Sequence, residues 1–292
     1  MIVPSMTLEL DGLTLHGASR AGIATHIAVP ELRLGLDIGD CPMSSVPLRT
    51  ILLSHAHTDH VLGLLRLLSL RDLQGLATPK VLAPAESVPA MRRWLAAWDE
   101  LEARSRAPTD RLIGVRPGEH HSLSKGLHVE VLAARHTLPV VGYRLRRTVQ
   151  TLRPDLVGRP GPEIGALARA GESVRVPVER DVLTFFGDHG PGTLDDNAAA
   201  LGAPVVIIEC TYLDPADREI SAARGHTHID DIVERAALFT GGRLVLKHLS
   251  MKHDPGEARR ALARLPAELR AKTVWLLPER DESSSAAGEY GQ

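Results

Sequence analysis

The sequence contains few of the features that mark secreted or membrane-bound proteins. Its 292 residues include only two cysteines, Cys41 and Cys210, which excludes a disulfide framework and a paired-cysteine metal motif. No apolar run reaches the roughly 18 residues that cross a bilayer. The N-terminus lacks the basic and apolar segments of a signal peptide. These absences predict a protein of the reducing cytoplasm that does not contact membranes.

An excess of positive charge is also missing. The formal net charge is −2, so no overall basic field attracts nucleic acid, and any RNA contact depends on a local patch. Arg144, Arg146 and Arg147 form the best candidate patch for substrate binding. A solvated arginine-rich edge explains the same pattern equally well.

The chain lacks a linker rich in glycine and serine, a shift in composition and an internal repeat. Its hydrophobic content of 43% is enough for one large core. We therefore expect a single domain over residues 1–280, followed by a polar tail, residues 281–292, that is disordered.

The most informative segment that is present holds three imidazoles and a carboxylate within six residues. It reads HAHTDH over residues 55–60, between an apolar run that predicts a strand and another that predicts a helix. Alternate side chains of an extended stretch share a face, so His55, His57 and Asp59 are expected to point one way. His60, at the helix start, then takes an adjacent position. Such ligands favour two neighbouring divalent metal ions. Zinc suits them best, and manganese or iron are alternatives. The alternative interpretation without a metal is a solvated histidine-rich loop.

Other short apolar runs also end at polar residues that could serve a site. Helical patterns alternate with these runs, which predicts an α/β protein whose sheets are covered by helices. The carboxyl ends of the strands are where open sheets place their sites. The runs end near Asp40, the histidine cluster, His136, Asp188, Glu209 and His248.

The motif and its surroundings resemble a known family. HxHxDH after a short apolar strand is similar to the metallo-β-lactamase superfamily. The segment Gly63–Leu68 that follows resembles the Gly-Leu-rich helix of its ribonuclease Z (tRNA 3′-endonuclease) branch. The resemblance runs from about Ile51 to His248, most of the chain. It implies a four-layer αββα sandwich.

The same resemblance implies three further ligands downstream. A lone histidine such as His136 is ordinarily a core residue, but its surroundings are similar to the family pattern, as are those of Asp188 and His248. Asp188 would bridge the two metals, and His189 stands where the family has threonine. The implied sets are His55, His57, His136 and Asp188 for one ion, and Asp59, His60, Asp188 and His248 for the other.

A second element concerns catalysis. The sequence Gly-His-Thr that ends at Thr227 resembles a ribonuclease Z signature, and Glu209 resembles the acid that supports its histidine. The resemblance implies that His226 assists phosphate binding and protonates the leaving group, with Thr227 also at the substrate. Asp59 would orient the attacking water as well as bind metal. Taken alone, His226 and Glu209 could have simple structural roles.

The resemblance implies a metal-dependent phosphodiesterase that uses a hydroxide activated by two metals, with removal of the 3′ trailer from pre-tRNA as one such reaction. The alternatives are another hydrolase of this fold (a cyclic nucleotide phosphodiesterase, a lactonase or a thioesterase) and a non-catalytic RNA-binding member. The expected partner is RNA or a small phosphodiester, and the sequence is compatible with a homodimer. Relatives carry a long arm that grips tRNA near residues 142–186. This segment is expected to be too short for a full arm, which predicts poor cleavage of pre-tRNA.

Overall fold

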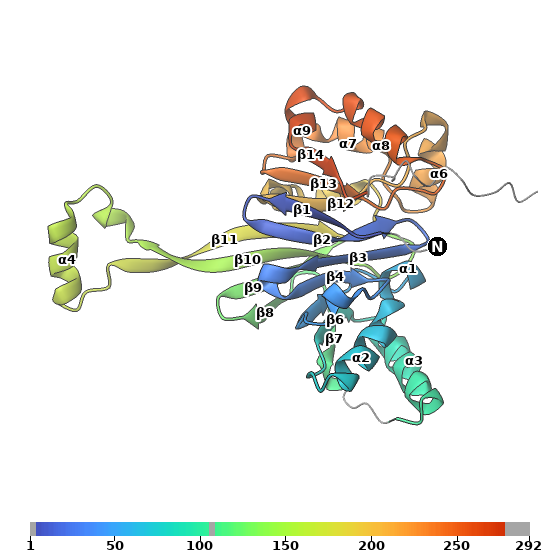
Figure 1. Ribbon diagram of the computed structural model, residues 1–292. Helices are drawn as coiled ribbons and strands as arrows, with labels where there is room; N and C mark the ends of the chain where they lie inside the picture. Colours follow the sequence, from blue (N-terminus) through green and yellow to red (C-terminus); the bar gives the residue numbers. More distant parts are fainter. Residues whose placement is uncertain (1–3, 105–108, 278–292) are drawn as a thin grey trace, which may run out of the picture.

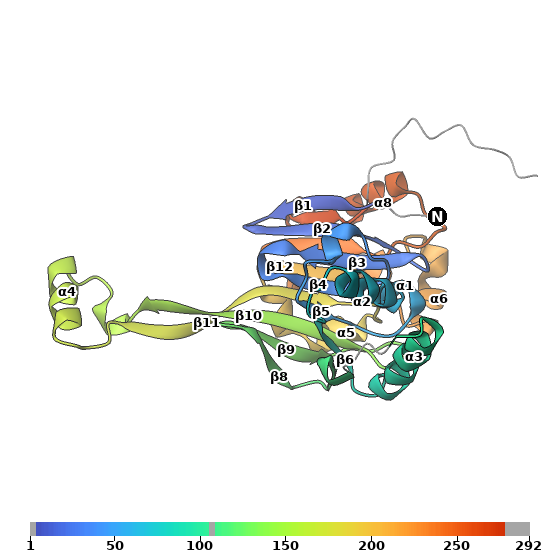
Figure 2. The ribbon, with the colours of Figure 1, turned by 60° about the horizontal axis from the view of Figure 1, so that its bottom comes forward.

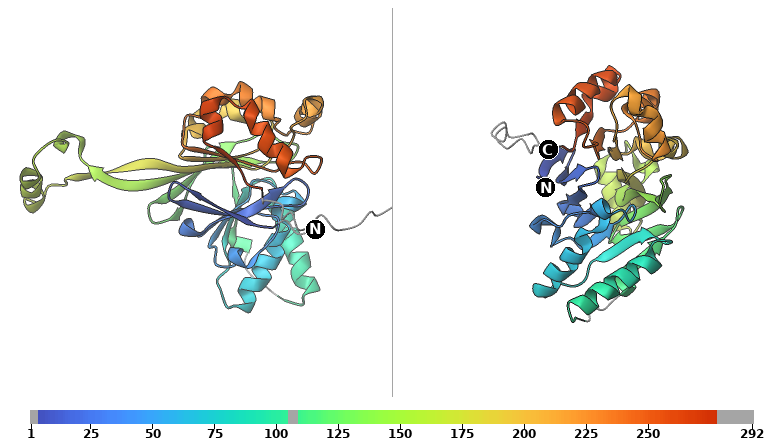
Figure 3. Two further views of the ribbon diagram at one scale, coloured as in Figure 1. Left: turned by 45° about the horizontal axis from the view of Figure 1, so that its top comes forward. Right: turned by 90° about the vertical axis from the view of Figure 1, so that its right-hand side faces the viewer.

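Two seven-stranded sheets packed face to face form the centre of the molecule, with helices on both outer faces (Figure 1; Figure 3). The computed structural model describes residues 4–104 and 109–277. The predicted αββα sandwich is therefore confirmed. The expected tail, residues 281–292, lies outside the described residues.

The first sheet has the order β1-β2-β3-β4-β5-β6-β7. Neighbours from β1 to β4 are antiparallel, and those from β4 to β7 are parallel. Its strands are β1 (Met6–Leu10), β2 (Leu13–Arg20), β3 (Ala24–Val29), β4 (Leu34–Ile38), β5 (Thr50–Leu52), β6 (Lys80–Pro84) and β7 (Leu112–Val115).

The second sheet repeats this plan, with the order β14-β13-β12-β11-β10-β9-β8. Neighbours from β8 to β11 are antiparallel, and those from β11 to β14 are parallel. Its strands are β8 (His120–Ser124), β9 (Leu127–Ala133), β10 (Val141–Leu152), β11 (Arg175–Phe186), β12 (Val205–Glu209), β13 (Arg243–Lys247) and β14 (Thr273–Trp275).

Each sheet is buried on both faces, which explains the unbroken apolar runs of the parallel strands. Leu52 packs into the core between the sheets with Phe185 and Ile207, whereas its neighbours Ile51 and Leu53 pack under helices. The helices over the first sheet are α1 (Thr58–Val61), α2 (Gly63–Leu73) and α3 (Val88–Leu101). Those near the second sheet are α5 (Gly192–Asp196), α6 (Arg218–Ala223), α7 (Ile229–Glu234), α8 (Pro255–Ala261) and α9 (Ala267–Ala271).

A two-stranded ribbon projects far from the sandwich and ends in helix α4 (Gly161–Arg169) (Figure 1; Figure 2). It is the outer half of β10 and β11, which pair without interruption from Arg146 to Leu152 on one strand. The expectation that this segment is too short for an arm is therefore wrong. The outer halves of both strands are largely solvated on both sides, so they lack the buried apolar face that reveals a strand.

None of the helices described is both long and apolar enough to span a bilayer.

Candidate metal centre

Seven of the predicted ligands meet at one edge of the sandwich. They follow the carboxyl ends of β5, β9, β11 and β13 or lie in α1, so both sheets contribute. Within each of three groups, the potential ligand atoms lie no more than 4.8 Å apart. The groups are His55, His57, His136 and Asp188; Asp59, His60 and His248; and Asp188, His226 and His248.

Asp188 lies between the two predicted ligand sets. Its carboxylate oxygens are 3.7 Å from His55 Nε2, 3.3 Å from His60 Nε2 and 3.2 Å from His248 Nε2. Asp59 is 3.3 Å from His248 Nε2 on the far side. One carboxylate therefore faces imidazoles of both sets, which is the position that a bridging ligand requires.

The donor atoms fit a divalent metal ion. His60 Nε2 and Asp188 Oδ1 are buried and lie 3.3 Å apart as an ion pair, but neither makes a hydrogen bond among the described residues. A buried polar atom without a partner is costly unless an ion completes it. Burial also lowers the pKa of His55 well below its usual value, which favours the neutral imidazole that binds metals. The buried imidazoles and carboxylates therefore form a site suited to divalent metals.

One acidic residue escaped the sequence analysis. Asp37 is buried at the end of β4, where its Oδ2 is 2.7 Å from His60 Nδ1 and accepts a hydrogen bond of 2.9 Å from the Ser54 hydroxyl. Ser54 Oγ in turn lies 3.0 Å from His55 Nδ1. Burial opposes a charge on His60, but Asp188 and Asp37 outweigh it and raise the pKa of His60 to about 10. Asp37 thus fixes the ring that presents Nε2 to the site, as an outer carboxylate does in metal centres. Its signal was a lone carboxylate within the apolar run Leu34–Ile38.

The local structure around Asp59 differs from the expectation. Helix α1 begins at Thr58, so Asp59 belongs to the helix rather than to an extended stretch with His55 and His57. Its Oδ2 accepts a hydrogen bond of 2.9 Å from the Gly22 amide. Gly39 permits the close approach of this helix, because a Cβ there would lie 1.8 Å from the Asp59 carbonyl oxygen. The carboxylate still reaches the predicted cluster by this different route.

Gly187 is a second point of close approach. A Cβ at this position would lie 2.0 Å from Ser54 Oγ and 2.3 Å from its Cβ. We expect Gly187→Ala to displace Asp188 from His55, because the strand end must move away from Ser54. Metal analysis of the purified variant should show loss of bound ions, while Gly165→Ala, whose Cβ would contact only an arginine side chain at 3.5 Å, should retain them. Normal metal content in both variants would contradict this expectation.

Comparison with known proteins identifies the family. A beta-lactamase superfamily domain model matches residues 39–249. The chain is 29% identical over 272 residues to tRNase Z TRZ1 of Arabidopsis thaliana, covering 92% of this chain and 96% of that protein. It is 31% identical over 251 residues to ribonuclease Z of Kineococcus radiotolerans, covering 78% of this chain and 76% of that protein. This chain belongs to the ribonuclease Z branch of the beta-lactamase superfamily.

Solved structures support the same fold. Human tRNase Z, short form, aligns with a TM-score of 0.56 at 18% identity, covering 81% of this chain and 92% of that one. Zn(2+)-bound PqqB from Methylobacterium extorquens aligns with a TM-score of 0.58 at 15% identity, covering 88% and 95%. At these identities the likeness shows the fold alone.

The Gly-His-Thr element of this ribonuclease Z-branch chain borders the metal cluster. His226 Nδ1 lies 2.8 Å from Glu209 Oε1, and its ring centroid is 5.5 Å from that of His248. Burial opposes a charge on His226, but Glu209 raises its pKa to about 9. Glu209 also accepts hydrogen bonds from the Thr211 hydroxyl and from the His189 amide, the latter at 2.7 Å. The imidazole is therefore held protonated by a fully buried carboxylate.

Three predicted substrate-binding residues, Thr227, Arg144 and Arg146, have protein partners instead of facing a substrate. Thr227 is 0% exposed, and its hydroxyl donates a hydrogen bond of 2.7 Å to the His189 carbonyl, so it supports the loop from behind rather than facing solvent. Arg144 donates to Asp181 at 2.9 and 2.7 Å. Arg146 lies within 3.3 Å of the same carboxylate and 3.4 Å of Glu130. Of the three candidate arginines, only Arg147 is exposed without an ion-pair partner in the described part of the chain.

Proposed function

We propose that this protein is a metal-dependent endoribonuclease that removes the 3′ trailer from pre-tRNA, and that its site holds two zinc ions. The carrying observation is that the Asp188 carboxylate faces imidazoles of both predicted ligand sets, beside the ion pair of His226 and Glu209. Imidazole and carboxylate ligands suit zinc, and manganese or iron would fit the same donors. Such ions, when bound, lower the pKa of water and neutralise charge on a phosphate.

The side chains around this site have separate roles in orienting water and in donating a proton. Asp59 is positioned by the Gly22 amide and is one of the four predicted ligands in the set with His248, so it can orient the attacking water. His226 is partly exposed and can donate its proton to the departing ribose oxygen, while Glu209 stabilises the charged imidazole. His136 is held in place by the Gly225 carbonyl, 2.9 Å from its Nδ1.

The arm supplies the expected contact with RNA. Between Arg144 and Asp181 the chain has eight arginines and five carboxylates, a local charge of +3 in a protein whose net charge is −2. Arg147, Arg169 and Arg180 have no carboxylate partner among the described residues. Arginines of this kind neutralise backbone phosphates. The relative named tRNase Z TRZ1, of which this chain covers 96%, supports the same substrate.

The direction of the arm favours a homodimer. β10 leaves the metal centre at Val141 and runs 12 residues to Leu152, about 40 Å, so the arm tip points away from the site on its own chain. We therefore propose that the arm of one subunit holds RNA whose cleavage site lies in the other.

The two cysteines are buried and free, in keeping with a cytoplasmic location.

His226→Ala should leave the metal content unchanged and lower turnover of pre-tRNA by roughly 10²–10⁴-fold, because the leaving oxygen loses its proton donor. The loss should be much smaller for bis-p-nitrophenyl phosphate, whose leaving group needs no proton. Steady-state kinetics on both substrates provide the measurement. An equal loss on both would indicate that His226 binds or positions phosphate instead.

The decisive experiment is incubation with a pre-tRNA that bears a 3′ trailer, beside bis-p-nitrophenyl phosphate and a lactone. Endonucleolytic release of the trailer supports the proposal. Brisk lactone hydrolysis without phosphodiester cleavage would assign the site to a different hydrolase.

A further inference from the structure

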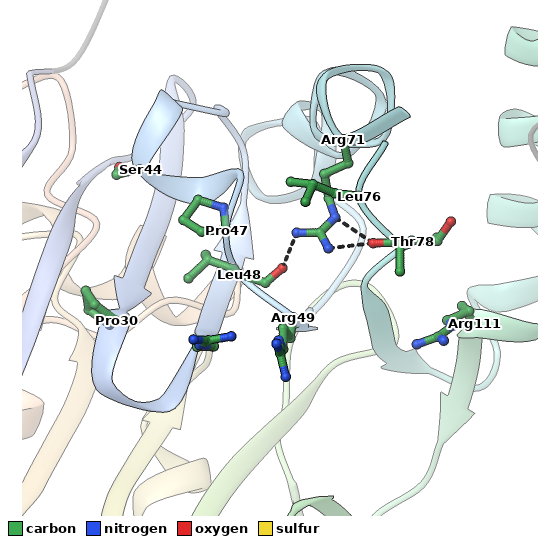
Figure 4. Close-up of a pocket in the computed structure, with 11 residues that line it drawn as sticks. Pro30, Ser44, Pro47, Leu48, Arg49, Arg71, Leu76, Thr78 and Arg111 are labelled. Carbon is green, nitrogen blue, oxygen red and sulfur yellow. Dashed lines mark hydrogen bonds between the residues drawn. The ribbon is translucent and has the colours of Figure 1, made fainter. Parts of the chain in front are cut away.

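A cavity of about 600 Å³ opens at the edge of the first sheet opposite the metal centre (Figure 4). Arg33, Arg49 and Arg111 directly precede β4, β5 and β7, and all three line it. Of these parallel strands, β5 leads at its other end to His55 and His57. Since β5 alone has three residues, about 10 Å of strand separates the two regions. The cavity is therefore distinct from the hydrolytic site.

The cavity is lined by positive charges that no carboxylate neutralises among the described residues. Arg33, Arg49 and Arg111 are exposed and have no carboxylate partner in residues 4–104 and 110–277. No aspartate or glutamate is among the residues that line the cavity. An arginine cluster that served only the fold would be expected to pair with acids, as Arg144 and Arg146 do with Asp181 on the second sheet.

A fourth arginine, Arg71, forms part of the inner wall of the cavity. Arg71 is 6% exposed and donates hydrogen bonds to the carbonyl oxygens of Val46, Leu48 and Ala77, the one to Leu48 at 2.7 Å. These carbonyls fix the guanidinium but do not neutralise it (Figure 4). Burial, with repulsion from Arg49 and Arg111, lowers the pKa of Arg71. An anion in the cavity would relieve this repulsion.

The rest of the wall is mainly apolar. It consists of Pro30, Pro47, Leu48, Leu76 and Ala77, with the side chains of Ser44 and Thr78 beside them. The volume lies in the range of small-molecule pockets, roughly 300–1,000 Å³. Guanidinium groups bind phosphates in a bidentate manner and stack on planar rings. A ligand that matches this wall has several negative charges and a flat, largely apolar part.

We propose that this cavity binds a nucleoside diphosphate or triphosphate, with the phosphates at Arg49 and Arg111 and the base against the proline and leucine side chains. An extended RNA backbone fits less well, because it needs an open track of charge rather than a concave apolar wall.

Calorimetric titration of the complete, metal-loaded protein tests this assignment, with ADP, pyrophosphate and adenosine as probes. ADP should bind more tightly than either fragment. The variant Arg49→Ala/Arg111→Ala should weaken ADP binding by at least about tenfold, because two charge-assisted contacts are lost. Arg259→Ala/Arg270→Ala, which removes two exposed arginines from α8 and α9, should bind ADP within twofold of the parent. This control separates the cavity from a general effect of charge.

Each other outcome overturns the assignment in a defined way. Equal ADP affinity in the parent and in Arg49→Ala/Arg111→Ala would place ADP elsewhere, for example on the metals. Pyrophosphate binding as tight as ADP binding would indicate a bare phosphate site. Loss of RNA hairpin binding with ADP unaffected would make the cavity an RNA contact. If the double variant fails to fold, Ser44→Trp, at an exposed position on the cavity wall, should block ADP while the four arginines remain.

Discussion

Asp188→Asn is expected to remove both proposed metal ions and to reduce phosphodiester hydrolysis by roughly 10³-fold or more, because in the proposed site both ions depend on this one shared carboxylate. The side chain keeps its volume, so the change tests charge and ligation rather than packing. Elemental analysis of the purified protein and turnover of bis-p-nitrophenyl phosphate provide the two measurements.

Asp195→Asn is the matched control. This carboxylate is half exposed on α5 and pairs with Arg235 at 2.8 Å on the surface, where an ion pair contributes little. The control should retain metal and activity. Two bound ions and near-normal turnover in the Asp188 variant would refute the bridging role.

Removal of the arm tip, which carries Arg153, Arg159 and Arg169, should have the second largest effect. Leu152 and Arg175 are partners at the tip of the ribbon, so residues 153–174 can be replaced by an Asn-Gly turn without disturbing the register of β10 and β11. We expect pre-tRNA cleavage to fall on the order of 10–100-fold in kcat/KM, because phosphate contacts outside the cleft are lost. Kinetics at two salt concentrations should also show a weaker salt dependence.

Hydrolysis of bis-p-nitrophenyl phosphate is the internal control, since this ester is too small to reach the arm. Its turnover should be unchanged by the deletion. Unimpaired pre-tRNA cleavage by the shortened protein would show that the arm tip does not hold the substrate and would remove the main argument for a dimeric arrangement.

The ligand cluster could be predicted from the sequence because its residues are chemically distinctive and closely spaced. His55 and His57 stand directly between a strand and a helix, Asp59 and His60 lie in that helix, and each remaining ligand follows an apolar run. Asp37 could not be found in this way. A single carboxylate in the run Leu34–Ile38 looks like an ordinary strand residue until the fold places it 2.7 Å from His60.

The arm and the ion pairs of Arg144 and Arg146 could not be predicted from the sequence for a related reason. Pattern analysis detects strands through one buried face, and the outer parts of β10 and β11 have none. The partners of Arg144 depend on strand register, which places Thr184 opposite this residue and Asp181 just beyond a bulge. Sequence spacing does not contain that register.

Because the ligands come from both sheets, the metal centre has a consequence for the order of events during biosynthesis. His248 follows β13, so the ligand set is incomplete until most of the chain has left the ribosome and the second half has packed against the first. Domains fold as units while synthesis proceeds, and a chain that ends before β13 still lacks His248. We therefore expect a truncated or misassembled chain to retain metal ions poorly, so that metal retention reports completed folding.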